Sequence, residues 1–236
     1  MTSKVYEYYL EKVVNCPKIE RSRANSPCTS VIVDSWVNLL GWGNPNSEIV
    51  FIGINPFYNA DAHQWHKTPQ GRTPLEHARI RSGEGASHAR HFSYHRRILR
   101  ELITINQDFE RAFSDNLKDF AFYTEVAFCP STDQAKLNNC ILAKCFEANV
   151  KQFIVNSGFQ VIVALGKIPS KICVESLIGN QAASDLTEYH GKVFQLPNEN
   201  KYLITSYHPN AFGKWNRSAV SGIIADLYNN KNKLRA

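Results

Sequence analysis

Three residues with chemically versatile side chains stand at or just past the ends of apolar runs in this sequence. They are an amide at Asn55, a carboxyl group at Glu125 and an imidazole at His208. Between them these groups can accept and donate hydrogen bonds, hold a water molecule and carry a proton. Such a set is typical of a site that acts on a polar ligand.

The apolar runs predict the elements that position these residues. Short runs rich in β-branched and aromatic residues alternate with helical patterns, which indicates a mainly parallel sheet covered on both faces. The fold is therefore expected to be α/β, a three-layer α/β/α domain over residues 1–236 with a central four-stranded sheet. The expected strands are Ile49–Ile52, Phe120–Phe128, Val161–Leu165 and Tyr202–Thr205, and the expected helices are Val5–Val14, Tyr94–Ile105, Leu137–Val155, Ile168–Ile178 and Ala219–Tyr228.

Parallel strands bring their carboxyl ends to one edge of a sheet, and ligands of open α/β sheets bind outside that edge. Three of the strands are followed at that edge by Gly53–Phe57, Gly166–Lys167 and Ser206–Pro209, and Thr124–Glu125 lies late in the remaining strand. The sequence therefore predicts one site at this edge, built from all four strands.

Composition narrows the class of protein. The chain is 43% hydrophobic, yet no apolar run approaches the roughly 20 residues that a membrane helix needs. Its first residues carry charges throughout, unlike a secretory signal. A cytoplasmic monomer without a membrane segment is expected.

Positive charge is concentrated in one segment. Residues 62–100 contain eight Lys/Arg and two acidic residues, so this segment carries as much net charge as the whole chain, +6. A basic segment of this kind predicts a polyanionic partner such as nucleic acid, although it also suits a solvated surface loop. The span from Phe57 to Phe92 is expected to be irregular, with a His/Arg-rich loop at about 58–91.

Taken in order, these segments resemble the uracil-DNA glycosylase superfamily over nearly the whole chain. The stretch "IVFIGINPF" is similar to the first motif of that family and closest to its mismatch-specific branch, and "SYHPNAF" resembles the second motif. Between them, "FYTEVAFCP" resembles a strand of the family, and "CFEANVKQFIVNSGFQVIVALGKIPSKI" resembles the helix, strand and turn of its iron-sulfur branch. The resemblance is weakest between Tyr58 and Arg90.

The resemblance implies a DNA glycosylase, which swings a nucleotide out of DNA and hydrolyses the bond between base and sugar. Asn55 would orient the attacking water, and His208 would donate a hydrogen bond to O2 of the departing base. No lysine stands at a nucleophile position, so the enzyme would be monofunctional and leave an abasic site. The other implied contacts are with the base for Gly53, Phe57, Phe92 and Glu125, and with DNA for Lys167, Arg96, Arg97, Pro209, Asn210 and Phe212, the wedge.

Several of these residues also have a plainer structural interpretation. Asn55 suits a turn before Pro56, and Phe92 and Phe212 suit core contacts. Phe57 stands where the family has a glycine, so it either reshapes the pocket or packs beneath it.

Glu125 departs from the family pattern, because uracil-specific relatives usually carry asparagine at this position. A carboxylate can only accept hydrogen bonds and would repel O4 of uracil, whereas the amino group of cytosine can donate to it. A protonated Glu125 could also donate to N3 of cytosine. The alternative is a salt-bridged strand glutamate.

The cysteines suggest a cofactor that catalysis does not need. By the resemblance, Cys16, Cys28, Cys129 and Cys145 would hold a structural [4Fe–4S] cluster, although Cys16 and Cys28 are spaced more widely than the family pattern. Cys140 and Cys173 suit buried apolar positions. A zinc site at His63 and His66 lacks completing ligands nearby.

The sequence thus supports three hypotheses. The first is a glycosylase for a modified cytosine, such as the hydroxymethylated or glucosylated cytosine of phage DNA, which would make it an antiviral defence enzyme. The second is a DNA repair glycosylase for uracil or other deaminated bases. The third is a non-catalytic DNA-binding protein on the same fold.

Overall fold

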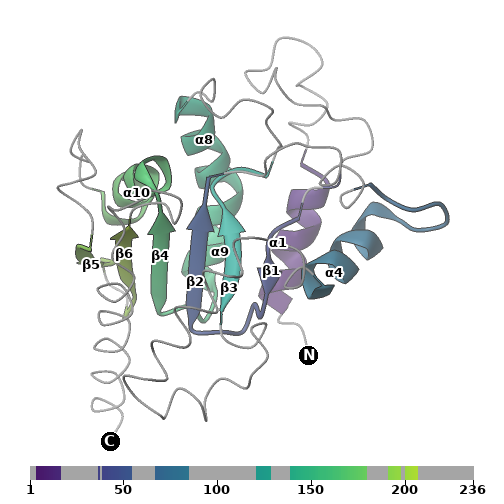
Figure 1. Cartoon of the computed structure of the whole chain (residues 1–236), viewed down its shortest axis with the longest axis horizontal. Coiled ribbons are helices and arrows are strands. Elements are labelled where there is room, and N and C mark those ends of the chain that lie inside the picture. The colour runs from purple at the N-terminus through teal and green to yellow at the C-terminus, as the bar shows by residue number, and fades with distance from the viewer. Residues whose placement is uncertain are drawn as a thin grey trace, which may run out of the picture.

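The described part of the chain forms one mixed sheet with helices packed on it (Figure 1). The computed structural model describes residues 4–16, 37, 39–54, 67–84, 121–128, 139–179, 191–197 and 200–206. The strands are β1 (Trp42–Gly43), β2 (Ile49–Gly53), β3 (Phe122–Glu125), β4 (Val161–Leu165), β5 (Val193–Gln195) and β6 (Tyr202–Ser206). Their order in the sheet is β1-β3-β2-β4-β6-β5.

The four expected strands make up the parallel centre of this sheet. β2 pairs with β3 and β4, and β4 pairs with β6, all in parallel. Every residue of β2, β3 and β4 is buried, as continuous apolar strands covered on both faces should be. The α/β prediction is confirmed. The sheet is wider than expected, because β1 and β5 add antiparallel edges of only two and three residues, too short to recognise as periodic runs.

The described helices match three of the expected ones. The helices that the structure describes are α1 (Lys4–Val14), α4 (Pro74–Glu84), α8 (Asn139–Cys145), α9 (Lys151–Asn156) and α10 (Lys167–Cys173), with π-helical turns η3 (Phe146–Val150) and η4 (Val174–Ile178). α8, η3 and α9 form one continuous run, and η4 extends α10. The expected helices Tyr94–Ile105 and Ala219–Tyr228 lie outside the described residues. None of the described helices is long and apolar enough to span a membrane.

The core lies between one face of the sheet and the helices α1, α9 and α10. Its centre is aromatic: Phe153 of α9 meets Tyr6 of α1, Phe122 of β3 and Phe159 edge-on, with ring centroids 5.5 to 6.4 Å apart. Aromatic pairs of this geometry add to the stabilisation from their burial. Asn156 donates a hydrogen bond to the Tyr9 hydroxyl at 2.9 Å and so ties α9 to α1.

Helix α4 corrects the expectation of an irregular span, because it lies inside it. Thr73 and Glu76 form a capping box: the Glu76 carboxylate accepts from the backbone N–H and the hydroxyl of Thr73, both at 2.8 Å, and the Glu76 N–H donates to the Thr73 hydroxyl at 3.2 Å. Pro74 occupies the first helical position, which suits proline. The helix rests beside α1, where Arg79 forms an ion pair with Glu7 at 2.8 Å.

Candidate active site at the carboxyl edge of the sheet

Four residues form one row across the carboxyl edge of the sheet. The register pairs Gly53 with Glu125 and Leu165 with Ser206, and Ile52 with Ala164 immediately before them. Gly53 therefore lies level with Leu165, and the row runs Glu125, Gly53, Leu165, Ser206. The convergence of strand ends that the sequence predicted is present.

Backbone hydrogen bonds continue this row beyond the strands. On one side, Val126 N–H donates to Gly53 O at 3.0 Å and Ala127 N–H donates to Ile54 O at 3.2 Å. On the other side, Gly166 N–H donates to Ser206 O at 2.8 Å. The chain leaving β2 is thus held beside the end of β3, and the end of β6 is held beside the β4–α10 turn.

Gly53 is packed so closely that only glycine fits. A Cβ atom placed on it would lie 1.9 Å from the Tyr123 hydroxyl oxygen, 2.8 Å from Tyr123 Cζ and 3.6 Å from Glu125 Cγ. Tyr123 and Glu125 are two residues apart on β3 and so project from the same face. The tyrosine ring leans over Gly53, and its hydroxyl and the glutamate side chain lie close together at the end of the row.

Glu125 is a buried acid. Its exposed fraction is 7%, and no ion pair or hydrogen bond joins its carboxyl group to another residue of the described ranges. Burial raises the pKa of Glu125 well above its usual range, because a charged carboxylate loses its hydration there. The salt-bridged alternative finds no support among these residues. A neutral Glu125 can both donate and accept a hydrogen bond.

Sequence reasoning missed Tyr123 and Trp42. Trp42 of β1 lies opposite Tyr123 in the antiparallel register, and the two rings stack with centroids 4.6 Å apart and planes 26° apart. Burial, and then the nearby Glu125, raise the pKa of Tyr123 well above its usual range, so its hydroxyl keeps its proton. The alternation of Tyr123 and Glu125 on one strand was the available signal, but β1 itself was not predicted.

Thr124 projects from the opposite face of β3 and fixes the strand in place. Its hydroxyl donates to the carbonyl oxygen of Leu40 at 2.6 Å, and the residue is completely buried. This bond anchors β3 to the segment before β1, and so helps to set the position of Glu125.

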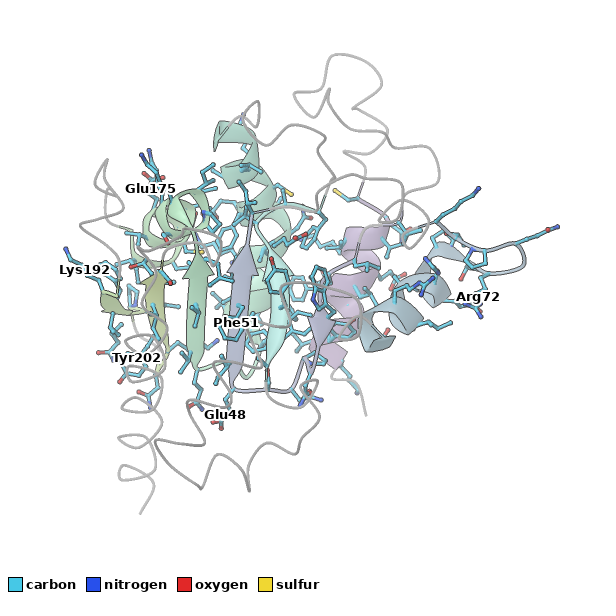
Figure 2. All side chains as sticks on the ribbon, viewed as in Figure 1. Glu48, Phe51, Arg72, Glu175, Lys192 and Tyr202 are labelled. Atoms are coloured by element: carbon cyan, nitrogen blue, oxygen red, sulfur yellow. The ribbon has the colours of Figure 1, made fainter. Side chains whose placement is uncertain are left out.

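Lys167 lies at the same edge, at the start of α10, and its side chain is exposed. Gly166 before it adopts a φ of +101°, a conformation that side chains disfavour, which lets the chain turn sharply from β4 into the helix. In the basic segment, Lys67 and Arg72 are exposed beside α4, and Figure 2 shows Arg72 extending away from the body of the fold.

The remaining expected site residues lie outside the described ranges. Ile54 is the residue before Asn55, and Ser206 stands two residues before His208. The expected residues not described are Asn55, Phe57, Phe92, Arg96, Arg97, His208, Pro209, Asn210 and Phe212. Their roles stay predictions.

Two of the four expected cluster ligands come together, although they are 129 residues apart in the sequence. The Asn149 side-chain nitrogen lies 4.0 Å from Cys16 Sγ and 3.6 Å from Cys145 Sγ, and neither cysteine forms a disulfide. Thiolates are the ligands that iron-sulfur clusters require, so this pair fits the group. Cys28 and Cys129 lie outside the described residues. Within the described ranges, no three His, Cys, Asp or Glu residues gather into a metal site.

Cys173, in contrast, is completely buried in the apolar core, as expected. Burial raises the pKa of its thiol, so it stays protonated. Cys140 belongs to α8.

Comparison with known proteins identifies the chain at the level of a family. Residues 40–228 match the family model described as the uracil DNA glycosylase superfamily, and this match includes every strand of the sheet. No curated protein matches the chain in sequence.

Proposed function

The chain belongs to the uracil-DNA glycosylase superfamily, whose members are DNA N-glycosylases, and from this premise we propose that its target is a modified cytosine. It is a hydrolase that acts on DNA. The proposal concerns which base it removes, and the buried Glu125 carries it.

Glu125 suits cytosine because its carboxyl group, when neutral, carries a proton that can bond to N3 of this base. The Watson–Crick edge of cytosine presents an amino donor and the N3 acceptor, and a neutral carboxyl group presents an acceptor and a donor to match. The pKa of Glu125, raised by burial, favours this neutral form. Cytosine leaves poorly as an anion, whereas a cytosine protonated at N3 leaves as a neutral molecule. Glu125 thus supplies the proton that makes this base a good leaving group.

The rest of the mechanism uses the row at the sheet edge. Asn55 and His208 each stand two residues beyond this row in the sequence, Asn55 after Gly53 and His208 after Ser206. The strands β2 and β6 are separated by β4 alone, so these two strand ends are about 10 Å apart. That spacing supports a flipped nucleotide between them, with Asn55 orienting water and His208 donating to O2.

The proposed reaction balances. The bond between C1′ and N1 breaks, and both electrons stay on the base. Water adds to C1′ and gives up a proton, which restores the proton that Glu125 passed to N3. The products are an abasic site and the free base.

Removal of ordinary cytosine would damage the genome of the host. The proposed target is therefore a cytosine marked at C5, such as the hydroxymethylated or glucosylated cytosine of phage DNA, and the proposed setting is antiviral defence. The exposed Lys167, together with Arg96, Arg97 and the segment Pro209–Phe212, is proposed to bind the DNA around the flipped base.

A [4Fe–4S] cluster on Cys16, Cys28, Cys129 and Cys145 is proposed as a structural group. The contact of Cys16 and Cys145 with one amide supports it. When bound, such a cluster crosslinks distant segments of a chain and needs no part in bond cleavage.

Uracil is the second candidate target, and the neutral state of Glu125 favours it too. By moving its proton to the other oxygen, a neutral carboxyl group can donate to O4 of uracil and accept from N3–H. Hydrogen bonding alone thus does not exclude uracil. The two candidates differ in the leaving group, because uracil departs without a proton at N3.

Glu125→Gln separates these candidates. Glutamine keeps one donor and one acceptor but has no proton to transfer. Matched DNA duplexes carrying uracil, cytosine, 5-hydroxymethylcytosine or its glucosylated form are treated with enzyme and then alkali, and strand cleavage is measured. We expect the wild type to cleave the modified cytosines, and Glu125→Gln to lose about 100-fold or more of that rate.

The control is Asn55→Ala, which should lose activity on every substrate. Wild-type cleavage of uracil alone would overturn the cytosine proposal and favour base repair. Undiminished cleavage of modified cytosine by Glu125→Gln would also overturn it, since the proton would then come from elsewhere.

A further inference from the structure

A buried side-chain amide lies between two cysteines from distant parts of the chain. Asn149 is 4% exposed and Cys145 is 8% exposed, while Cys16 is partly buried. The Asn149 nitrogen is 3.6 Å from Cys145 Sγ and 4.0 Å from Cys16 Sγ. Because both sulfurs contact one nitrogen, they are close enough to belong to one metal centre.

Local structure explains how the three residues meet. Cys145 ends α8, and Asn149 follows four residues later in η3, so both side chains lie on the same side of the helical run. In η3 the Lys151 N–H bonds to Phe146 O, one residue further back than in an α-helix. Such π-helical turns occur frequently at functional sites. Cys16 arrives through the turn after α1, where its N–H donates to Val13 O.

The donor count of the amide matches the two sulfurs. An asparagine NH2 group carries two N–H donors, and both partners of this nitrogen within the described ranges are sulfur atoms. A thiol sulfur is a weak acceptor, whereas a metal-bound thiolate carries negative charge and accepts strongly. The two donors of this buried amide therefore form their strongest hydrogen bonds when both sulfurs are metal-bound thiolates.

We propose that Asn149 is a positioning residue for an iron-sulfur centre, in which it donates one hydrogen bond to each of the ligands Cys16 and Cys145. The inference rests on the cluster proposed above and is independent of which base the enzyme removes. Hydrogen bonds to ligand sulfurs withdraw negative charge, which favours the reduced cluster and raises its reduction potential. They also orient the ligands and slow the loss of metal.

The test compares Asn149→Leu with a matched control on the same helical run. Leucine removes both donors and keeps a similar volume. The control is Asn156→Leu, seven residues further along. It removes the 2.9 Å hydrogen bond from Asn156 to the Tyr9 hydroxyl, which joins α9 to α1 and does not involve a sulfur atom. The full-length proteins are prepared without oxygen, and iron, sulfide, visible absorption, reduction potential and the rate of iron release to a chelator are measured.

We expect the wild type and Asn156→Leu to share one reduction potential and one rate of iron release. Asn149→Leu should have a more negative potential and release iron about 10-fold faster. Asn149→Asp, which is nearly the same size, replaces the two donors with an oxygen that repels thiolates and should retain less iron still. This variant keeps the inference testable if the leucine substitution prevents folding.

Two outcomes would overturn the inference, and they differ. A wild-type protein that contains no iron and sulfide after reconstitution removes the cluster and the role of Asn149 together. A wild-type cluster with Asn149→Leu and Asn149→Asp indistinguishable from Asn156→Leu leaves the cluster standing and refutes the role of Asn149 alone. Neither outcome bears on the choice of base, which the alkali-cleavage assay measures separately.

Discussion

Replacing Gly53 with alanine tests the packing that shapes the candidate site. The new methyl group would lie 1.9 Å from the hydroxyl oxygen of Tyr123, whereas ordinary contact begins at 3.4 Å. The hydroxyl would therefore have to move by about 1.5 Å. It has little freedom to do so, because the Tyr123 ring is buried and stacked on Trp42, and the Glu125 side chain lies nearby.

Overpacking of a buried site typically costs 1–3 kcal/mol. We expect Gly53→Ala to lower the free energy of unfolding by about 2 kcal/mol, measured by urea denaturation. Removing the hydroxyl should relieve about half of this strain, since the next atom, Tyr123 Cζ, lies at 2.8 Å and needs to move only about 0.6 Å. In the Tyr123→Phe background the same substitution should therefore cost about 1 kcal/mol less.

The matched control is Gly158→Ala, because a methyl group at Gly158 would meet no atom within 4 Å. This substitution should change the unfolding free energy by no more than about 0.5 kcal/mol. The reasoning is refuted if Gly53→Ala costs no more than Gly158→Ala, or if its cost is the same with tyrosine and with phenylalanine at position 123.

Four further predictions follow from single contacts. Glu125→Gln should stabilise the protein increasingly as pH rises from about 4.5, because the unfolded wild type then loses a proton that the folded protein, with its raised pKa, retains; unfolding curves that differ equally at every pH would contradict this. Thr124→Val should cost about 1–3 kcal/mol in urea unfolding by leaving the Leu40 carbonyl without its 2.6 Å hydrogen bond, and a cost near zero would show that this bond is not needed. Thr73→Ala should lower stability by about 1 kcal/mol through loss of the capping box, and glycine at this position should restore much of it. Lys167→Ala should reduce the slope of log affinity against log salt for DNA by about one, and an unchanged slope would remove Lys167 from the DNA interface.

The sequence was sufficient to predict the four parallel strands of the sheet and the edge where their carboxyl ends meet. Continuous apolar runs such as Val161–Leu165 can be buried on both faces only in a covered parallel sheet, and the edge follows from strand direction. The capping box at Thr73–Glu76 was also present in the sequence and would have predicted α4 inside the span expected to be irregular.

The contacts that shape the site were not predictable in the same way. That the Tyr123 hydroxyl lies over Gly53 depends on the register between β2 and β3, which no local pattern encodes. The meeting of Cys16 with Asn149 depends on how α1 packs against η3, across 133 residues of sequence. Propensity and periodicity are local, whereas these contacts are long-range.

The burial of Glu125 is itself an argument for function. A buried acid lowers stability at neutral pH, because the folded protein must keep a proton that the unfolded chain releases. Glutamine would fill the same space without this cost. The fold of the protein alone therefore does not require a carboxyl group at position 125. The described helices cover the opposite face of the sheet, where Thr124 provides the structural hydrogen bond of β3. What Glu125 offers and glutamine does not is a transferable proton.

The two proposed sites are connected through the chain that follows Glu125. The backbone bonds of Val126 and Ala127 hold this chain against β2, Phe128 is buried, and Cys129 comes next. Figure 1 shows α1 running with its C-terminal end toward the strand arrowheads, so the turn that carries Cys16 lies on that side of the fold. A cluster that binds both Cys129 and Cys16 would thus anchor the segment that leaves the base-contacting strand. Loss of the cluster should then loosen this segment and lower the free energy of unfolding, whereas the proposed hydrogen bonds to the base need only Glu125 itself.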